Sequence, residues 1–373
     1  MHDSDRATQT TPNRVTALAN SRLSVAVQPR GPLSELLSFT IGLGAAPSQV
    51  ERGLAGVQEA ADRAVALSPG LVVDEDIQLS LFLLYGLHYG SIPNLEASLE
   101  WHPSLIAARL SLEAAFEHEV RSLVDVHEPP APRRKEVAAW LFRATAPQGP
   151  PRLPLFIARS ATLEQVRELL IQRSIYTLRE ADPHSWAIPR LTGTAKAALV
   201  EIQSDEYGGG DPKRVHATIF AQTMRGAGLD DTYGAYLDQV PAITLASQNM
   251  MSMFGLNRRL LGAIVGHLAA FEMTSSIPSK LYGDGFRRLG FAKDVTWYFD
   301  EHVEADAVHE QIAGHDLAGS LAQDRPELLA DILFGALACL ALDDMAGEHL
   351  LGAWQRGESS LRRPATALVA DRR

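Results

Sequence analysis

Residues 162–180 read TLEQVRELLIQRSIYTLRE, and this stretch carries the kind of signal that decides the fold class. Thr162 and Gln165 have the spacing of a capping box, in which each side chain binds a backbone N–H at the start of a helix. Apolar residues then recur at helical spacing, at Val166, Leu169, Leu170, Ile175 and Leu178. A helix is therefore predicted from Thr162 to about Glu180, ending before Pro183.

Similar signals recur along the chain on both sides of this stretch. Further helices are predicted at about residues 193–206, 211–226, 257–272, 294–308 and 326–354, and the earlier ranges 57–67 and 96–123 also read as helical. Asp211, Asn257 and Asp294 are expected to cap three of them. Only Leu23–Val27 and Leu153–Ile157 resemble strands, and both are short. The predicted fold class is all-α.

A proline-rich stretch, TAPQGPPRLPL at residues 145–155, divides the chain, because prolines at this density do not continue a helix. We therefore expect a helical N-terminal domain over residues 26–150 and a helical bundle over residues 151–355. Residues 1–25 and 356–373 are expected to be tails.

The composition excludes several classes of partner. Lys and Arg number 34 and Asp and Glu 45, so the net charge of −11 disfavours nucleic acid and anionic membrane surfaces. No run approaches the roughly 18 consecutive apolar residues that a membrane helix needs. The single cysteine, Cys339, excludes an internal disulfide framework and a cysteine-based zinc site, and fits the cytoplasm.

The most informative polar stretch is FDEHVEADAVH at residues 299–309. His302, Asp306 and His309 stand at i, i+4 and i+7, so a helix places them on one face. Two imidazoles and a carboxylate on one stripe suit Fe, Mn or Zn. The alternative is a solvated polar face with no metal.

Four more residues join this stripe in a single hypothesis. Glu272 interrupts the apolar run AIVGHLAAFEM, while Glu180, Glu206 and His216 lie at predicted helix ends. Taken singly, each reads as surface charge. Taken together, acids and histidines from four helices are what a dinuclear carboxylate site in a bundle requires. The ferritin-type Glu-x-x-His pair is absent from the sequence, so the spacing pattern is a different one.

This pattern resembles the haem-oxygenase-like di-iron oxidases, most closely their N-oxygenase branch. That branch includes the N-nitrosourea-forming enzyme of streptozotocin biosynthesis and the 2-aminoimidazole N-oxygenase of azomycin biosynthesis. The resemblance covers about residues 155–350. It implies two iron ions, cycling between Fe2+ and Fe3+, held by Glu180, the Glu-x9-His pair Glu206 and His216, Glu272, and the His-x3-Asp-x2-His set His302, Asp306 and His309.

The resemblance also implies a fold and an activity. The fold is a haem-oxygenase-like helical bundle preceded by a helical domain that helps to form a homodimer. The activity is a monooxygenase reaction in specialised metabolism, with O2 as co-substrate and electrons from an external reductant or reductase. The substrate is a small amine, guanidine or aminoimidazole, which becomes an N-hydroxy or nitro product. The sequence leaves no room after the bundle for the cupin domain of the nitrosourea-forming relatives, so N–N bond formation is not expected.

The pocket and the exact chemistry are less constrained by the sequence. Five residues near the proposed ligands are expected to line a substrate pocket, although core packing is the alternative for each: Tyr176, Phe220, Phe271, Met273 and Thr274. His184 is expected to cap a loop.

Two other functions are possible alternatives to N-oxygenation. One is C–C cleavage or desaturation of a fatty or amino acid by the same type of centre, and the other is a non-enzymatic helical binding protein. The third histidine, His302, favours N-oxygenation.

Overall fold

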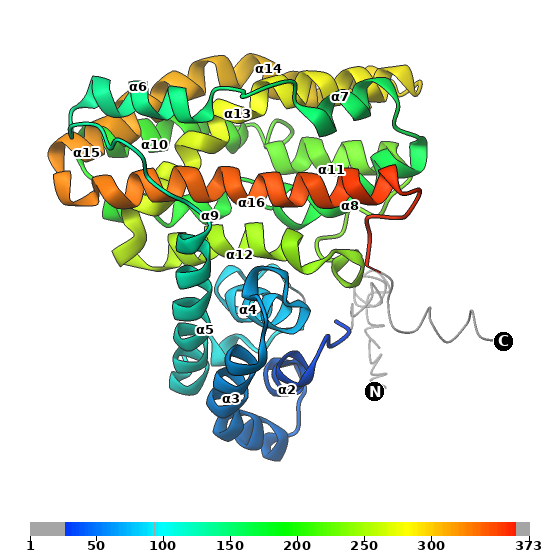
Figure 1. Ribbon diagram of the computed structural model, residues 1–373. Coiled ribbons are helices and arrows are strands. Elements are labelled where there is room, and N and C mark those ends of the chain that lie inside the picture. The colour runs from blue at the N-terminus through cyan, green and yellow to red at the C-terminus, as the bar shows by residue number, and fades with distance from the viewer. Residues whose placement is uncertain (1–26, 93, 363–373) are drawn as a thin grey trace, which may run out of the picture.

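The computed structural model describes residues 27–92 and 94–362, without the side chains of residues 304–307. The structure is 75% helical and has no strand within the described residues. The predicted all-α helical fold is confirmed (Figure 1). Residues 23–26 of the first weak strand candidate lie outside the described residues, and the other candidate, Leu153–Ile157, lies inside a helix.

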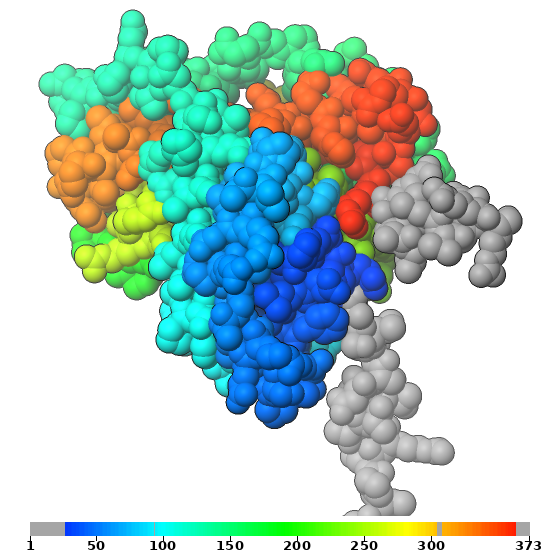
Figure 2. Space-filling model, turned by 60° about the horizontal axis from the view of Figure 1, so that its bottom comes forward, coloured from blue at the N-terminus to red at the C-terminus, as the bar shows by residue number. Residues whose placement is uncertain are grey.

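The chain folds as a smaller first block and a larger bundle (Figures 1 and 2). The first block contains α2 (Pro32–Ile41), α3 (Pro47–Leu67), α4 (Glu75–Tyr89) and α5 (Pro103–Ser122). The bundle contains α6 (Arg134–Thr145), α7 (Arg152–Arg159), α8 (Leu163–Thr177), α9 (Asp182–Ser185), α10 (Gly193–Glu206), α11 (His216–Gly226), α12 (Ala242–Leu256), α13 (Leu261–Arg288), α14 (Lys293–Gln311), the π-helix η7 (Ile312–Gly319), α15 (Ser320–Asp324) and α16 (Leu329–Gln355). The two parts meet where α4 packs on α12.

The capping box at the start of α8 forms as predicted. The Gln165 N–H donates to Thr162 Oγ1 at 3.3 Å, and the Thr162 N–H donates to Gln165 Oε1 at 2.9 Å. The helix ends earlier than expected, at Thr177, and the turn that follows carries Glu180 and Ala181.

Three predicted N-caps are wrong because their side chains or neighbours have other roles. Asp211 Oδ1 accepts from the Lys213 N–H in a turn, and α11 begins only at His216. Asn257 Nδ2 donates to Glu113 Oε2 at 3.0 Å instead of capping a helix. Asp294 lies inside the first turn of α14 and makes no cap.

Glycines let the two longest helices, α13 and α16, pack closely. A Cβ at Gly266 would overlap the backbone carbonyl of Ile332, and one at Gly335 would overlap that of Ala263. This contact fixes the position of α13, which carries Glu272. One stretch that includes α13, Arg258–Arg288, is apolar and long enough to cross a membrane, but 67% of its most apolar window is buried inside the protein.

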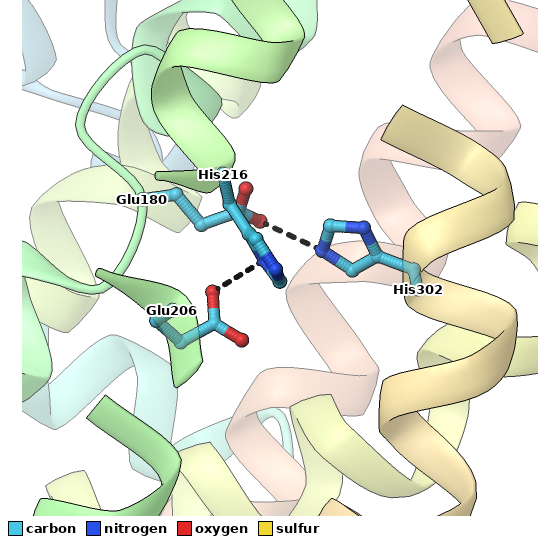
Figure 3. Close-up of side chains that lie close together, drawn as sticks. All are labelled: Glu180, Glu206, His216 and His302. Carbon is cyan, nitrogen blue, oxygen red and sulfur yellow. Dashed lines mark ion pairs between the residues drawn. The ribbon is translucent and has the colours of Figure 1, made fainter. Parts of the chain in front are cut away.

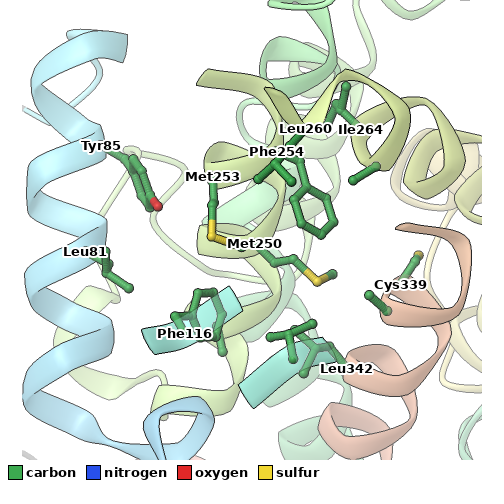
Figure 4. Packing of buried hydrophobic residues seen from close by; sticks show 14 of the residues in the cluster. Leu81, Tyr85, Phe116, Met250, Met253, Phe254, Leu260, Ile264, Cys339 and Leu342 are labelled. Carbon is green, nitrogen blue, oxygen red and sulfur yellow. The ribbon is translucent and has the colours of Figure 1, made fainter. Parts of the chain in front are cut away.

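The apolar core is continuous between the first block and the bundle (Figure 4). Tyr85 and Phe116 of the first block belong to the same buried cluster as Phe254 and Cys339. A second, smaller cluster contains Phe220, Tyr298 and Phe299. After α16 the chain is held to the bundle, since the Ser360 N–H donates to Glu168 Oε2 at 2.8 Å.

Candidate metal centre

Six of the seven predicted ligands lie inside the bundle with their side chains described. Glu180 follows α8, Glu206 ends α10 and His216 begins α11, while Glu272 lies in α13 and His302 and His309 in α14. All six are buried, with at most 7% of each residue exposed. Asp306 lies in α14, but its side chain is outside the described residues.

The first ligand group consists of Glu180, Glu206, His216 and His302 (Figure 3). One donor atom from each residue lies within 4.8 Å of the others. His216 Nδ1 is 2.9 Å from Glu206 Oε2, and His302 Nε2 is 3.6 Å from Glu180 Oε1. The group is compact enough for one ion to reach all four residues.

The second group consists of Glu206, Glu272 and His309, again with donor atoms within 4.8 Å of one another. His309 Nδ1 lies 3.4 Å from Glu272 Oε2 and 3.8 Å from Glu206 Oε1. Glu206 therefore belongs to both groups, with one oxygen facing His216 and the other facing His309. A carboxylate shared in this way suits two adjacent ions.

Hydrogen bonds orient two of the imidazoles toward this space. His302 Nδ1 lies 2.7 Å from the Tyr298 carbonyl, which only accepts, so this nitrogen carries the proton and Nε2 faces Glu180. His309 Nε2 lies 3.2 Å from Asp205 Oδ2, which leaves Nδ1 toward the two glutamates. Ligand histidines in metalloproteins are typically fixed by such outer partners.

The buried nitrogens fit a metal better than they fit the protein alone. Nδ1 of His216 and Nδ1 of His309 are buried and make no hydrogen bond of acceptable geometry within the described residues. Both face carboxylates, and a cation between them would bind both partners. Imidazole and carboxylate donors together suit iron. Cys339, the only thiol, lies elsewhere in α16, beside Asp343.

The electrostatics of the centre show how strongly it attracts positive charge. Burial lowers the pKa of His309, but the nearby carboxylate of Glu272 outweighs burial, together with Asp205 and Glu206, and the pKa is raised to about 9. Burial raises the pKa of Glu272, and the charge of Glu206 adds to this effect. Without a metal, a proton on His309 balances part of the carboxylate charge.

A hydrogen-bond partner of Glu180 was missed in the sequence. The buried Tyr298 hydroxyl lies 2.8 Å from Glu180 Oε1 and 2.9 Å from Oε2, so it donates to this carboxylate. Its ring packs against His302, with the centroids 4.3 Å apart. Tyr298 precedes His302 by one helical turn, which is the spacing that could have identified it.

The turn after Glu180 is strained and firmly held. Ala181 has a φ of 74°, in the left-handed region, which costs a residue with a Cβ about 1–2 kcal/mol. The Ala181 carbonyl accepts from Gln203 Nε2 at 2.8 Å, and its N–H donates to the Tyr176 hydroxyl at 3.4 Å. Strain of this kind often accompanies functional sites.

A cavity of about 10 Å³ lies beside the ligands. Of the five residues predicted to line a substrate pocket, Tyr176 and Phe271 line this cavity and the other three do not. Phe220 packs on the Tyr298 ring, with the centroids 5.0 Å apart. Met273 points to α6, with its Sδ 3.6 Å from Thr145 Oγ1, and the Thr274 hydroxyl donates to the Ala270 carbonyl.

Three polar residues of the cavity wall were not predicted: His184, Gln203 and Ser275. The expectation that His184 caps a loop is wrong, because it is 1% exposed and its Nε2 lies 3.2 Å from Nδ1 of His267. Burial lowers the pKa of His184 to about 3, so the ring is neutral. No pattern in the sequence links these residues, since their proximity depends on how α9, α10 and α13 pack.

One comparison with known proteins, the match to a family model, agrees with the composition of this site. Residues 167–344 match the model of a family described as iron-containing redox enzymes, and this range includes every predicted ligand. None of the curated proteins compared matches the chain. Among solved structures, a CADD-like protein of unknown function from Nostoc punctiforme is similar, with 16% identity, a TM-score of 0.42, and coverage of 64% of this chain and 96% of that chain. The family match supports iron-dependent redox chemistry for the bundle.

Proposed function

We propose that this protein is a non-haem di-iron monooxygenase that uses O2 to oxygenate a nitrogen atom of a small amine, guanidine or aminoimidazole. The observation that carries the proposal is the position of Glu206, whose two oxygens face two separate ligand groups. A site for one metal ion has no need of such a shared carboxylate. The family match and the donor set support iron as the metal.

The choice of N-oxygenation rests on the ligand pattern. The residues His302, Asp306 and His309 have the His-x3-Asp-x2-His spacing of the N-oxygenase branch. His302 lies in the first ligand group and His309 in the second, so both outer histidines of that pattern face the centre.

The chain's own residues prepare the centre for this chemistry. Bound iron supplies the activation of O2 and the oxygen transfer to the substrate nitrogen. The Tyr298 hydroxyl holds Glu180 in place. The Tyr298 carbonyl fixes which ring nitrogen of His302 faces the centre, and the Asp205 carboxylate does the same for His309. Burial of every described ligand excludes bulk water from the reacting atoms.

Other parts of the proposal concern the setting of the reaction. We expect two electrons per turnover from an external reductant or reductase, a cytoplasmic location, and a product of specialised metabolism. We also expect a homodimer formed with the help of the first block. The acidic chain, with its net charge of −11, disfavours nucleic acid and anionic membranes as partners.

The test begins with the purified protein loaded with Fe(II) without oxygen. We would add O2 and a reductant to a panel of amines, guanidines and aminoimidazoles, with fatty and amino acids as the competing class, and analyse products by mass spectrometry with 18O2. The proposal predicts at least one 18O atom on a nitrogen of one panel member, with a single atom in an N-hydroxy product and more in a nitro product. Label on no nitrogen, with shortened or unsaturated acids instead, would support the C–C cleavage alternative.

Matched variants separate this enzyme from a helical binding protein. Glu206→Gln should abolish product formation, because it weakens both ligand groups. Glu201→Gln makes the same change on the exposed face of α10 and should leave activity unchanged. A protein that takes up no iron and forms no product with any substrate would leave the non-enzymatic alternative standing.

A further inference from the structure

One wall of the cavity beside the metal centre is polar and takes no part in either ligand group. Gln203 lies one turn before Glu206 in α10, and His184 lies in α9, four residues after Glu180. They are 3% and 1% exposed, and both line the cavity. Each of the two residues is therefore close in sequence to a proposed ligand. Neither belongs to a ligand group, so their side chains can contact a substrate.

The amide of Gln203 has a fixed orientation. Its Nε2 donates to the Ala181 carbonyl at 2.8 Å and to Ser185 Oγ at 2.7 Å, so both amide hydrogens are used. Oε1 is left as the acceptor, and it is buried with no hydrogen-bond partner among the described residues. Leaving a buried acceptor without a hydrogen bond is unfavourable. A donor in the cavity would remove this cost.

His184 adds a second polar atom to the same wall. Its Nε2 lies 3.2 Å from His267 Nδ1, so one proton lies between the two rings. His184 Nδ1 is buried and has no hydrogen-bond partner among the described residues. It accepts a hydrogen bond when His184 donates to His267, and it donates one when His267 donates to His184. Gln203 Oε1, in contrast, accepts only.

The charge and size of the cavity narrow the class of ligand. Glu180, Glu206 and Glu272 line it, and its described lining includes no Lys or Arg. A carboxylate would therefore find no basic side chain to bind in this lining and would meet the acceptor Gln203 Oε1 on this wall. The volume of about 10 Å³ is close to what a single water needs, so the cavity takes one small polar group. A terminal nitrogen with its hydrogens fits these requirements.

We propose that Gln203 and His184 form the recognition site for the terminal nitrogen of the substrate, which donates an N–H to Gln203 Oε1. The substrate is then a small base of the amine, amidine or guanidine class and not a carboxylic acid. This inference rests on the proposed function, because it assumes that the adjacent centre holds iron and acts on that nitrogen.

Equilibrium binding tests the inference without turnover. The Fe(II)-loaded protein would be titrated without oxygen in a calorimeter with methylguanidinium and, separately, with propionate, which is of similar size. Methylguanidinium should bind and propionate should not. Gln203→Met keeps the length of the side chain but removes the acceptor, and should weaken methylguanidinium binding about tenfold. Gln248→Met makes the same change at a buried glutamine of α12 outside the cavity lining and should leave the affinity unchanged.

The iron content of each variant shows whether a negative result contradicts this inference alone or the proposed function as well. Equal affinity of the wild type and Gln203→Met would overturn the inference. A protein that holds two iron ions but does not bind methylguanidinium would also overturn the inference. The iron site of the proposed function would be retained in that case, and the cavity would hold only water. A protein that binds no iron would contradict the proposed function and this inference with it. If Gln203→Met loses iron, Gln203→Asn replaces it, because the shorter amide withdraws the acceptor from the cavity and should also weaken binding.

Discussion

At the scale of single residues, the centre depends on side chains that hold the ligands as much as on the ligands themselves. Tyr298 donates to both oxygens of Glu180, and Asp205 holds the outer nitrogen of His309. Partners of this kind commonly change metal affinity 10- to 100-fold when they are removed. They are therefore the residues at which the geometry can be tested without removing a ligand.

Tyr298→Phe removes the hydroxyl and leaves the buried ring. We expect the protein to fold and its affinity for Fe(II) at the first ligand group to fall at least tenfold, because Glu180 loses its fixed orientation. Competition with a chelating dye measures this affinity without oxygen. Tyr282→Phe is the control, because Tyr282 is a buried tyrosine of the same core cluster with no hydrogen bond to any of the six ligands whose side chains are described. Equal losses in the two variants would contradict the role of Tyr298.

The metal-free protein should lose stability at alkaline pH. The pKa of His309 is raised from 6.5 to about 9, so its contribution is complete below pH 6.5 and is lost as the pH rises through 9. The loss in the free energy of unfolding should be at most about 3 kcal/mol. Urea denaturation of the metal-free protein at several pH values measures it. His309→Asn should flatten this pH dependence, and an unchanged slope would show that His309 is not protonated as described.

The sequence allowed the ligand residues to be proposed but not their partners. His302 and His309 share one helical face, a relation that spacing alone reveals. Gln203 and His184 come together only because the folded chain places α10 beside α9, where Gln203 Nε2 donates to Ser185 Oγ, and no local pattern encodes such a contact. Phe220 and Met273 lie near ligands in the sequence, yet Phe220 packs on the Tyr298 ring and the Met273 sulfur contacts the Thr145 hydroxyl.

At the scale of helices, the contact between α13 and α16 sets where Glu272 stands. Gly266→Ala would place a Cβ onto the Ile332 carbonyl. We expect a loss of about 1–3 kcal/mol in stability, as for other overpacked cores, and weaker iron binding because α13 must shift. Thermal unfolding followed by circular dichroism measures the stability.

Gly352→Ala in α16 is the matched control for this substitution. A Cβ there would meet only the flexible end of Arg356, 3.4 Å away. Because alanine is the better helix former, the control should be neutral or slightly stabilising. A stable Gly266→Ala protein with normal iron binding would contradict the importance of this close contact.

Helix positions were easier to predict than helix starts. The apolar residues of α8 and α16 reflect burial of the helix, and each pattern extends over many residues. The first residue of a helix is predicted from a single capping side chain, and that side chain can instead form a hydrogen bond with another part of the protein. Thr162 caps its own helix, whereas Asn257 binds Glu113 of the first block, a contact that becomes visible only in the folded chain.

At the scale of the whole molecule, metal binding should be coupled to stability. The ligands come from α10, α11, α13, α14 and the turn after α8, so an ion links elements far apart in the sequence. A ligand at 100 times its Kd stabilises the folded state by about 2.7 kcal/mol. Anaerobic Fe(II) should therefore raise the Tm, and Glu206→Gln should remove most of the increase. An equal rise in that variant would mean that the stabilising iron binds elsewhere.

The all-α class followed from the helical periodicity, because it needs no knowledge of long-range contacts. The extent of the first block, its role in a homodimer and the boundary near residue 150 stay predictions. The continuous core between Tyr85 and Phe254 shows that the first block and the bundle pack directly on each other.

The most direct test of the account is anomalous diffraction at the iron edge from crystals loaded with Fe(II) without oxygen. The account predicts two peaks per chain, about 3.5–4 Å apart, with Glu206 between them. One peak should lie among Glu180, His216 and His302, and the other should lie beside Glu272 and His309. A single peak, no peak, or iron bound away from Glu206 would contradict the shared-carboxylate centre.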